Sequence, residues 1–244
     1  MASSRSSVPR CRWSHPGRLV EYLSLTGMSS EKSLKVAVLA SGAGTNLQAL
    51  LDQVHGREGI TIVAVASDNA DAYALERAAQ AGVPTAVFPR RDFGGDRLAR
   101  DRAMSDWLRE RGTQLVVMAG YMQLVSEPFL DRFSDAVINV HPSLLPAFPG
   151  IDAVSQAIAY GVKLFGVTVH FADPGLDTGP VIMQRSVGLP DARELDDVLP
   201  HIHAIEHQML PEVVRLFARG AVRIASTHPR RVLVGPLAVL PERP

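Results

Sequence analysis

The chain has 244 residues, and its 25 Lys and Arg residues are balanced by 25 Asp and Glu residues. A net charge of zero gives no general attraction to nucleic acid or to an anionic membrane. The single cysteine, Cys11, excludes an intrachain disulfide, and no apolar run approaches the roughly 20 residues needed to span a bilayer. These features predict a soluble protein of a reducing compartment, which we expect to be the cytoplasm, and they argue against nucleic acid or a membrane as partners.

The two ends of the chain differ in composition from its middle. The N-terminal stretch is rich in Ser and Arg and has no acid before Glu21, which is typical of a transit peptide or of an extension upstream of a working start at Met28. The other end is repeatedly interrupted by proline. We expect residues 1–33 to be an extension that is disordered or not native, residues 34–225 to be one domain, and residues 226–244 to be a C-terminal tail.

From Lys35 onward, short apolar segments alternate with helical patterns, which is typical of an α/β protein with a parallel sheet. Strands are predicted at 35–40, 60–67, 85–89, 114–120, 135–140, 163–172 and 179–187, and helices at 46–54, 71–82, 96–112, 127–133, 152–161 and about 194–219. The pattern predicts a single Rossmann-like domain with a mostly parallel twisted sheet, helices on both faces and an antiparallel C-terminal portion. Pro200 and Pro211 should kink the last helix or mark a start inside it.

The first strand and helix are joined by a glycine loop, SGAGTN, at residues 41–46. Its glycines let the backbone approach a ligand, and the amide of Asn46 beside Thr45 suits a single phosphate at the helix N-terminus. The loop lacks the Lys-Ser/Thr of a triphosphate-binding loop. It half-matches the dinucleotide fingerprint, with Asp68 near the place of the ribose-binding acid. The loop alone leaves a phosphate site, an NAD-binding oxidoreductase and an ordinary tight turn open.

The segment INVHPSLLPAFPG displays two polar side chains at the end of a predicted strand. Asn139 and His141 are two residues apart, so they lie on one face of the strand, and Pro142 then ends it. Downstream, VTVHFADPGLDTGP carries Asp177 in a Gly/Pro loop. Capping of turns explains each segment taken alone.

If the carboxylate of Asp177 instead meets His141, the group can stabilise an oxygen that becomes negative and can move a proton. No Ser, Cys or Lys stands beside the three as a nucleophile, and there is no ligand set for a metal. We therefore expect direct transfer to an electrophilic carbonyl, with the attacking group supplied by a substrate or by water.

Four motifs together resemble one known family. SGAGTNLQALL, AGYMQLVSEPFL, INVHPSLLPAFPG and GVTVHFADPGLDTGP, in this order, are similar to the folate-dependent formyltransferases, and the resemblance runs from about Lys35 to Arg223. It is most specific for the members that formylate phosphoribosylglycinamide in purine biosynthesis. The resemblance implies a transferase that uses 10-formyltetrahydrofolate as co-substrate, without a metal, as a monomer or homodimer.

The resemblance also implies roles for individual residues. His141 would be the general acid, Asn139 would help to stabilise the oxyanion, and Asp177 would support His141 and shuttle protons. The residues implied for phosphoribosylglycinamide are Gly44, Thr45, Asn46, His203 and Glu206, and those implied for the folate are Arg97, Met122, Gln123, Leu124, Val125, Asn139, Asp173 and Leu176. This chain departs from some relatives, with His203 in place of glutamine and Gln123 in place of arginine.

Several rival functions remain at this stage. A formyltetrahydrofolate deformylase shares the three catalytic residues and uses water as nucleophile, but such members carry an additional N-terminal regulatory domain. A methionyl-tRNA formyltransferase shares the strand-end motif, and its usual basic C-terminal domain fits poorly with a neutral chain. A non-enzymatic nucleotide-binding module would not require Asn139, His141 and Asp177 to converge. The NAD-dependent oxidoreductase would bind NAD tightly.

Overall fold

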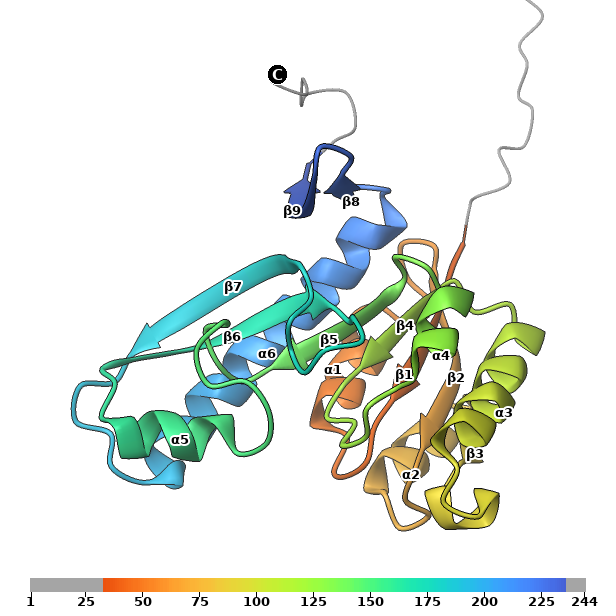
Figure 1. Cartoon of the computed structure of the whole chain (residues 1–244), viewed down its shortest axis with the longest axis horizontal. Coiled ribbons are helices and arrows are strands. Elements are labelled where there is room, and N and C mark those ends of the chain that lie inside the picture. The colour runs from red at the N-terminus through yellow and green to blue at the C-terminus, as the bar shows by residue number, and fades with distance from the viewer. Residues whose placement is uncertain (1–32, 236–244) are drawn as a thin grey trace, which may run out of the picture. The chain divides into compact units, whose positions relative to one another are not determined.

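The computed structural model describes residues 33–235. Within them, one seven-stranded sheet has the order β3-β2-β1-β4-β5-β6-β7 (Figure 1). Its strands are β1 (Leu34–Leu39), β2 (Ile60–Ser67), β3 (Thr85–Val87), β4 (Leu115–Met118), β5 (Val137–His141), β6 (Leu164–Phe171) and β7 (Val181–Gly188). β1 to β5 pair in parallel, and β6 and β7 are antiparallel additions. The predicted fold class is confirmed.

Helices cover both faces of this sheet (Figure 1). They are α1 (Thr45–Gln53), α2 (Tyr73–Gln80), α3 (Arg97–Glu110), α4 (Glu127–Arg132), α5 (Ala153–Tyr160) and α6 (Leu195–Ala218), with a short 3₁₀ helix, η1 (Arg90–Phe93). One apolar core includes buried residues of α1, α2, α5 and α6, and the other includes those of α3 and α4. The central strands are buried on both faces, which explains their unbroken apolar sequences.

The strand order places several loops at one edge of the sheet. β2 and β3 extend the sheet on one side of β1, whereas β4 and β5 extend it on the other. The order in which strands are added therefore reverses between β1 and β4, which is the topological switch point of the sheet. Ligands of open α/β sheets bind outside the carboxyl ends of the strands at such a point. The glycine loop follows β1, residues 119–126 follow β4, and the segment after His141 follows β5. The fold therefore brings three of the predicted motifs to the same edge.

The last helix is continuous. α6 begins at Leu195 and contains both Pro200 and Pro211. A capping box between Glu194 and Asp197 determines where the helix starts, five residues before the first proline. Of the two predicted alternatives, a start at a proline inside this helix is therefore wrong, and a kink at a proline stays a prediction.

The C-terminal region differs from the predicted tail. β8 (Val222–Ala225) and β9 (His228–Val234) form an antiparallel hairpin across the expected boundary at residue 226. Pro229 lies near the start of β9, where a missing backbone N–H is tolerated. Arg230 donates a hydrogen bond of 2.7 Å to the carbonyl of Thr178, which joins the hairpin to the loop after β6. The predictions for residues 1–32 and 236–244 lie outside the described part of the chain.

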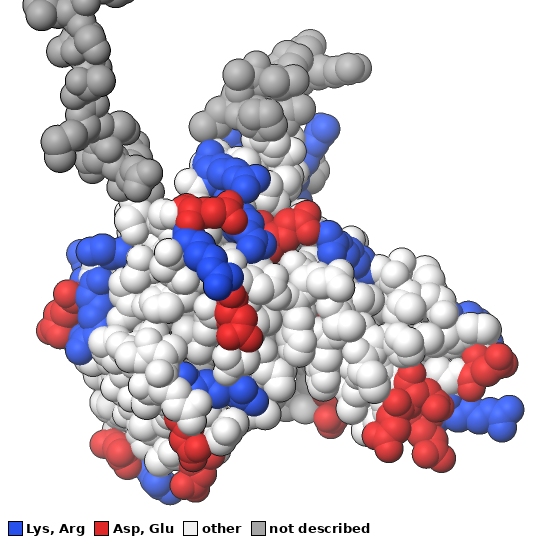
Figure 2. All heavy atoms as spheres, turned by 180° about the vertical axis from the view of Figure 1, so that it is seen from behind, with Lys and Arg blue, Asp and Glu red and all other residues white. Residues whose placement is uncertain are grey.

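Charged side chains of both signs are interspersed on the face shown in Figure 2. Glu58 accepts hydrogen bonds of 2.8 Å from Arg215 and 2.9 Å from Arg219. Among residues 33–235, no helix combines the length and the hydrophobicity needed to cross a bilayer.

Candidate active site

Three side chains from two distant segments converge beside β5. Asn139 and His141 are on β5, and Asp177 comes from the connection between β6 and β7. Asp177 Oδ1 is 3.3 Å from Asn139 Nδ2, and Asp177 Oδ2 is 3.4 Å from His141 Nδ1. The side chains of His141 and Asp177 are only 6% and 12% exposed, so water screens their interaction weakly. The structure brings the three residues together around one carboxylate.

Both nitrogens of the His141 ring face acceptors. Nδ1 faces the carboxylate of Asp177, and Nε2 is 2.8 Å from the carbonyl oxygen of Phe148. Only the doubly protonated ring donates to both. Phe148 and Asp177 each have a φ of 52°, a left-handed conformation that is costly for residues other than glycine. The surrounding loops therefore hold two strained residues against the ring, which is typical of a preorganised site.

The carboxylate of Asp177 is held by donors on both oxygens. In addition to Asn139 and His141, the backbone N–H of Gly150 donates to Oδ2 at 2.7 Å. Burial alone would raise the pKa of the Asp177 carboxyl, but hydrogen bonds from His170 and Gly150, with the charges of His141 and His170, lower this pKa below its ordinary value. Asp177 is therefore an anion at neutral pH.

A fourth polar residue, His170, completes this cluster and was absent from the predicted set. It lies directly opposite Asn139 in the β5–β6 pair, with its Nε2 3.1 Å from Asn139 Nδ2 and 3.6 Å from Asp177 Oδ1. Its Nδ1 is 2.8 Å from the carbonyl of Phe171, which fixes the ring with Nε2 between the Asn139 amide and the Asp177 carboxylate. His170 thus orients Asn139. Its position in the strand sequence VTVHF was the available signal, but the register that pairs it with Asn139 was not.

The glycine loop leads directly into the N-terminus of α1. Gly44 has a φ of 70°, and a Cβ there would lie 2.7 Å from Cα of Ala74, so only glycine fits this turn. No side chain caps α1, and its first N–H groups are therefore not consumed by a cap. Thr45 and Asn46 are the first two residues of this helix. This geometry suits a phosphate.

Asn46 connects the loop to the last helix. Its Nδ2 donates to Glu206 Oε2 at 2.9 Å, whereas its buried Oδ1 has no partner among the described residues. His203 is on the same helix as Glu206, is exposed, and stacks on His207 with ring centroids 6.1 Å apart. The predicted sugar-phosphate residues are therefore assembled from the two ends of the domain, with an unpaired acceptor that a ligand hydroxyl can satisfy.

Burial raises the pKa of Glu206 above its ordinary value, although the hydrogen bond from Asn46 and the charge of His203 oppose the shift. When the pKa of an acid is higher in the folded state than in the unfolded state, the group's contribution to stability is fully present below the unfolded-state pKa. That contribution is lost as the pH rises through the folded-state pKa. We expect Glu206→Gln to raise the Tm at pH 8 by about 2–4 °C. This gain should shrink as pH falls towards the ordinary Glu pKa, as measured by thermal unfolding from pH 5 to pH 8.

The exposed Glu110 provides the matched control for this prediction, and Glu110→Gln should leave the Tm unchanged. A lower Tm for Glu206→Gln at every pH would mean that the carboxylate stabilises the apo fold. It would contradict a burial penalty at this position.

Apart from Asn139 on β5, the residues predicted to bind folate lie on two loops and one helix. Met122 and Leu124 are exposed large apolar side chains of the loop after β4, whereas Val125 is buried in the same loop. The N–H of Met122 donates to Ser41 Oγ at 2.9 Å, and Ser41 donates to Asp68 at 2.5 Å, so this loop is tied to the glycine loop. The carboxylate of Asp68, which the dinucleotide interpretation assigned to a ribose, has this internal partner.

The remaining predicted folate residues are less closely connected. Asp173 accepts hydrogen bonds from the Gly175 N–H and the Thr178 hydroxyl, within the loop that carries Asp177. Leu176 is half-exposed in the same loop. Arg97 is the first residue of α3 and is exposed; within residues 33–235 no hydrogen bond or ion pair joins its side chain to another predicted site residue.

No group of three or more His, Cys, Asp or Glu side chains in the described part of the chain has the geometry to hold a metal ion. Asn139, His141, His170 and Asp177 therefore form a hydrogen-bonded cluster of donors and one carboxylate. Such a cluster can bind and polarise a carbonyl oxygen and can exchange a proton with its surroundings.

Comparison with known proteins places the chain among relatives of known type. Residues 34–214 match the family model described as formyl transferase. The chain is 39% identical over 191 residues to phosphoribosylglycinamide formyltransferase of Haemophilus influenzae, an alignment that covers 78% of this chain and 90% of that protein. The crystal structure of glycinamide ribonucleotide transformylase 1 from Symbiobacterium toebii is 44% identical, with a TM-score of 0.79 over 83% of this chain and 94% of the other.

A more distant structural neighbour represents one of the rival functions. A formyltetrahydrofolate deformylase from Pseudomonas syringae pv. tomato has a TM-score of 0.75 at 25% identity, covering 83% of this chain and 66% of that chain. The higher identity and the fuller coverage lie with the transformylases. The predicted family is confirmed, and the chain belongs to the formyl transferase family.

Proposed function

We propose that this chain transfers a formyl group from 10-formyltetrahydrofolate to the amine of phosphoribosylglycinamide, a step of purine biosynthesis. The observation that carries the proposal is the convergence of Asn139, His141 and Asp177 in a largely buried cluster. No Ser, Cys or Lys side chain belongs to this cluster, so the nucleophile is not a protein side chain, and we assign it to the substrate amine. The transformylases named above support the identity of the two substrates.

In the reaction, the lone pair of the amine forms a bond to the formyl carbon, and the bond from that carbon to N10 of the folate then breaks. The amine loses one proton and N10 gains one. Binding both substrates side by side replaces a bimolecular encounter and supplies a large part of the rate gain. No covalent intermediate with the protein forms.

Asn139 and His141 act on the formyl oxygen as it becomes negative. The His141 proton on Nε2 is held by the neutral carbonyl of Phe148, and an oxyanion is a stronger acceptor than a carbonyl. The developing charge therefore competes successfully for this proton. Asp177 orients the ring through Nδ1, and His170 holds the amide of Asn139 in place. Each such donor is worth about 2.7–4 kcal/mol in the transition state.

The two substrates occupy two adjacent groups of residues, one around the glycine loop and one along the predicted folate loops. The phosphate of phosphoribosylglycinamide binds at Gly44, Thr45 and Asn46, with the ribose at Glu206 and His203. The folate binds along the loop from Met122 to Val125 and the loop that carries Asp173 and Leu176, with Arg97 towards its acidic end. We assign this activity to residues 34–225, in the cytoplasm.

One assay tests this function. The purified protein is incubated with 10-formyltetrahydrofolate, with and without phosphoribosylglycinamide, and deformylation of the folate is followed together with formate release. We expect deformylation only when the amine substrate is present, without free formate. Formate release without the amine would identify a deformylase, and tight NAD binding with no formyl transfer would favour the oxidoreductase.

A further inference from the structure

A fully buried ion pair lies on α3, outside the catalytic cluster. The side chains of Arg100 and Asp101 are 0% and 1% exposed. Arg100 Nη2 is 2.6 Å from Asp101 Oδ1, and Arg100 Nε donates to the same oxygen at 2.8 Å. Burying two charges is costly, and apolar residues of similar volume usually serve a core as well or better. The pair therefore needs an explanation beyond packing.

The remaining polar contacts of the pair all go to the loop between β4 and α4. Arg100 donates from Nη2 to the carbonyl of Leu124 at 2.9 Å and from Nη1 to Oε1 of Gln123 at 3.3 Å. Asp101 Oδ2 accepts from the N–H of Ser126 at 2.6 Å. The two charges thus hold the segment from residue 123 to residue 126 by its backbone at two points and by one side chain. This segment is the part of the loop that displays Leu124.

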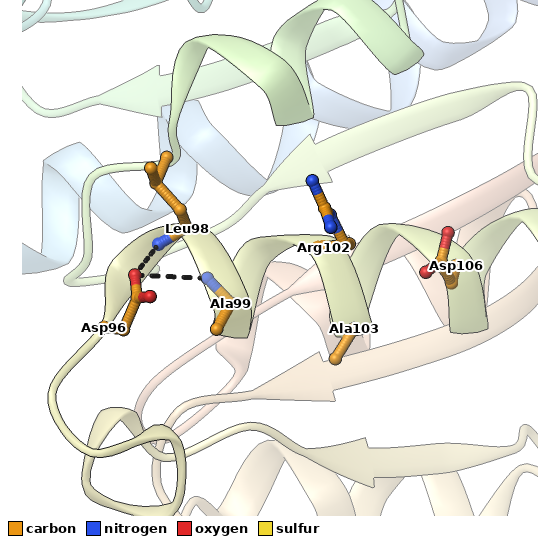
Figure 3. Close-up of a pocket in the computed structure, with 6 residues that line it drawn as sticks. All are labelled: Asp96, Leu98, Ala99, Arg102, Ala103 and Asp106. Atoms are coloured by element: carbon orange, nitrogen blue, oxygen red, sulfur yellow. Dashed lines mark hydrogen bonds between the residues drawn. The ribbon is translucent and has the colours of Figure 1, made fainter.

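The helix that carries the pair has a capped N-terminus. Asp96 caps α3 by accepting from the N–H groups of Leu98 and Ala99, at 2.8 and 3.2 Å (Figure 3). The opposite side of α3 is a surface depression of about 400 Å³ lined by Asp96, Leu98, Ala99, Arg102, Ala103 and Asp106. None of these residues belongs to the cluster around Asp177. α3 therefore presents one face to solvent, and Arg100 and Asp101 on its other face hold the loop by hydrogen bonds.

We infer that Arg100 and Asp101 are positioning residues for the folate co-substrate, because they fix the loop on which its ring system rests. The inference depends on the proposed function and extends it to two residues that do not touch the substrates. The guanidinium is required rather than a charge alone, since only its planar fork reaches Asp101, Leu124 and Gln123 together. The effect should fall on the binding of one substrate, because the sugar-phosphate residues belong to α1 and α6.

The test compares steady-state kinetics for both substrates in three variants and the wild type. Arg100→Lys keeps the charge but loses the fork. The double variant Arg100→Met with Asp101→Asn removes both charges, so that no unpaired charge stays buried. Arg102→Met, in the exposed depression of the same helix, is the control. Each KM is measured with the other substrate saturating, together with kcat and the Tm.

We expect Arg100→Lys and the double variant to raise the KM for 10-formyltetrahydrofolate about tenfold, as misplaced binding groups do, with the KM for phosphoribosylglycinamide within about twofold of the wild type. Arg102→Met should match the wild type. An unchanged folate KM in both test variants, or an equal rise of both KM values, would overturn the inference and leave a purely structural pair. A wild-type protein without formyl transfer would instead refute the proposed function itself.

Discussion

Replacement of His141 by alanine is expected to lower kcat by about 10²-fold or more while both substrates still bind measurably. His141 is 5% exposed and makes its contacts with Phe148 and Asp177, so its loss removes the donor for the oxyanion without altering the glycine loop. An interaction made only in the transition state lowers kcat and kcat/KM equally. The measurement is single-turnover formyl transfer together with the dissociation constant of each substrate.

The exposed His228, on β9, provides the matched control, and His228→Ala should retain the wild-type kcat. If His141→Ala instead raised KM at constant kcat, its role would be the binding of the ground state. The assignment of the general acid would then be wrong.

Replacement of Asp177 by asparagine should also reduce kcat by about 10²-fold or more, since the carboxylate that orients the His141 ring loses its negative charge. The two carboxylate oxygens accept from Asn139 on one side and from Gly150 and His141 on the other. The NH₂ group of an asparagine would replace one of these two oxygens. Either Asn139, or Gly150 and His141 together, would then face a donor instead of an acceptor. Asp191→Asn, in an exposed turn, is the control. Near-complete turnover in Asp177→Asn would refute the role of this carboxylate.

The same pair of proteins yields a stability test. The folded-state pKa of Asp177 is below its ordinary value, so this residue stabilises the fold above the unfolded pKa and loses that contribution as pH falls through the folded pKa. The wild type should therefore have a higher Tm than Asp177→Asn at pH 7. The difference should persist down to about pH 4, near the ordinary Asp value, and disappear below it. A difference that is constant down to pH 2 would mean that the charge of Asp177 does not contribute.

Local patterns were sufficient to predict the sheet, the helices on both faces and the loops that follow β1 and β5. The strand-end pair of Asn139 and His141 follows from alternation along one strand, and the turn before Asp177 from its Gly and Pro residues. The contact between Asp177 and His141 was predicted from chemistry and not from a local pattern, because the expected reaction needs a carboxylate beside an imidazole. Coordinates with Asp177 turned away from His141 would have removed the site.

The parts that escaped prediction depend on long-range register and on burial. His170 pairs with Asn139 only through the antiparallel alignment of β6 with β5, which the strand sequences do not specify. Arg100 and Asp101 lie in a helix crowded with charged residues, a pattern that favours solvent exposure, and only the three-dimensional packing shows that they are buried. The Pro-punctuated end near Pro229 was assigned to a tail because prolines usually interrupt strands, yet an exposed hairpin tolerates them.

The hydrogen bond between Asn46 and Glu206 joins residues 160 positions apart in the chain. During synthesis, the glycine loop leaves the ribosome long before α6 does, so Asn46 of a nascent chain cannot reach Glu206 until α6 docks. Contacts of such sequence separation form late, after the entropy of closing the long loop has been overcome. If the proposed sugar phosphate binds here, it requires α1 and α6 to be docked together, so its binding free energy would stabilise the contact between these two helices.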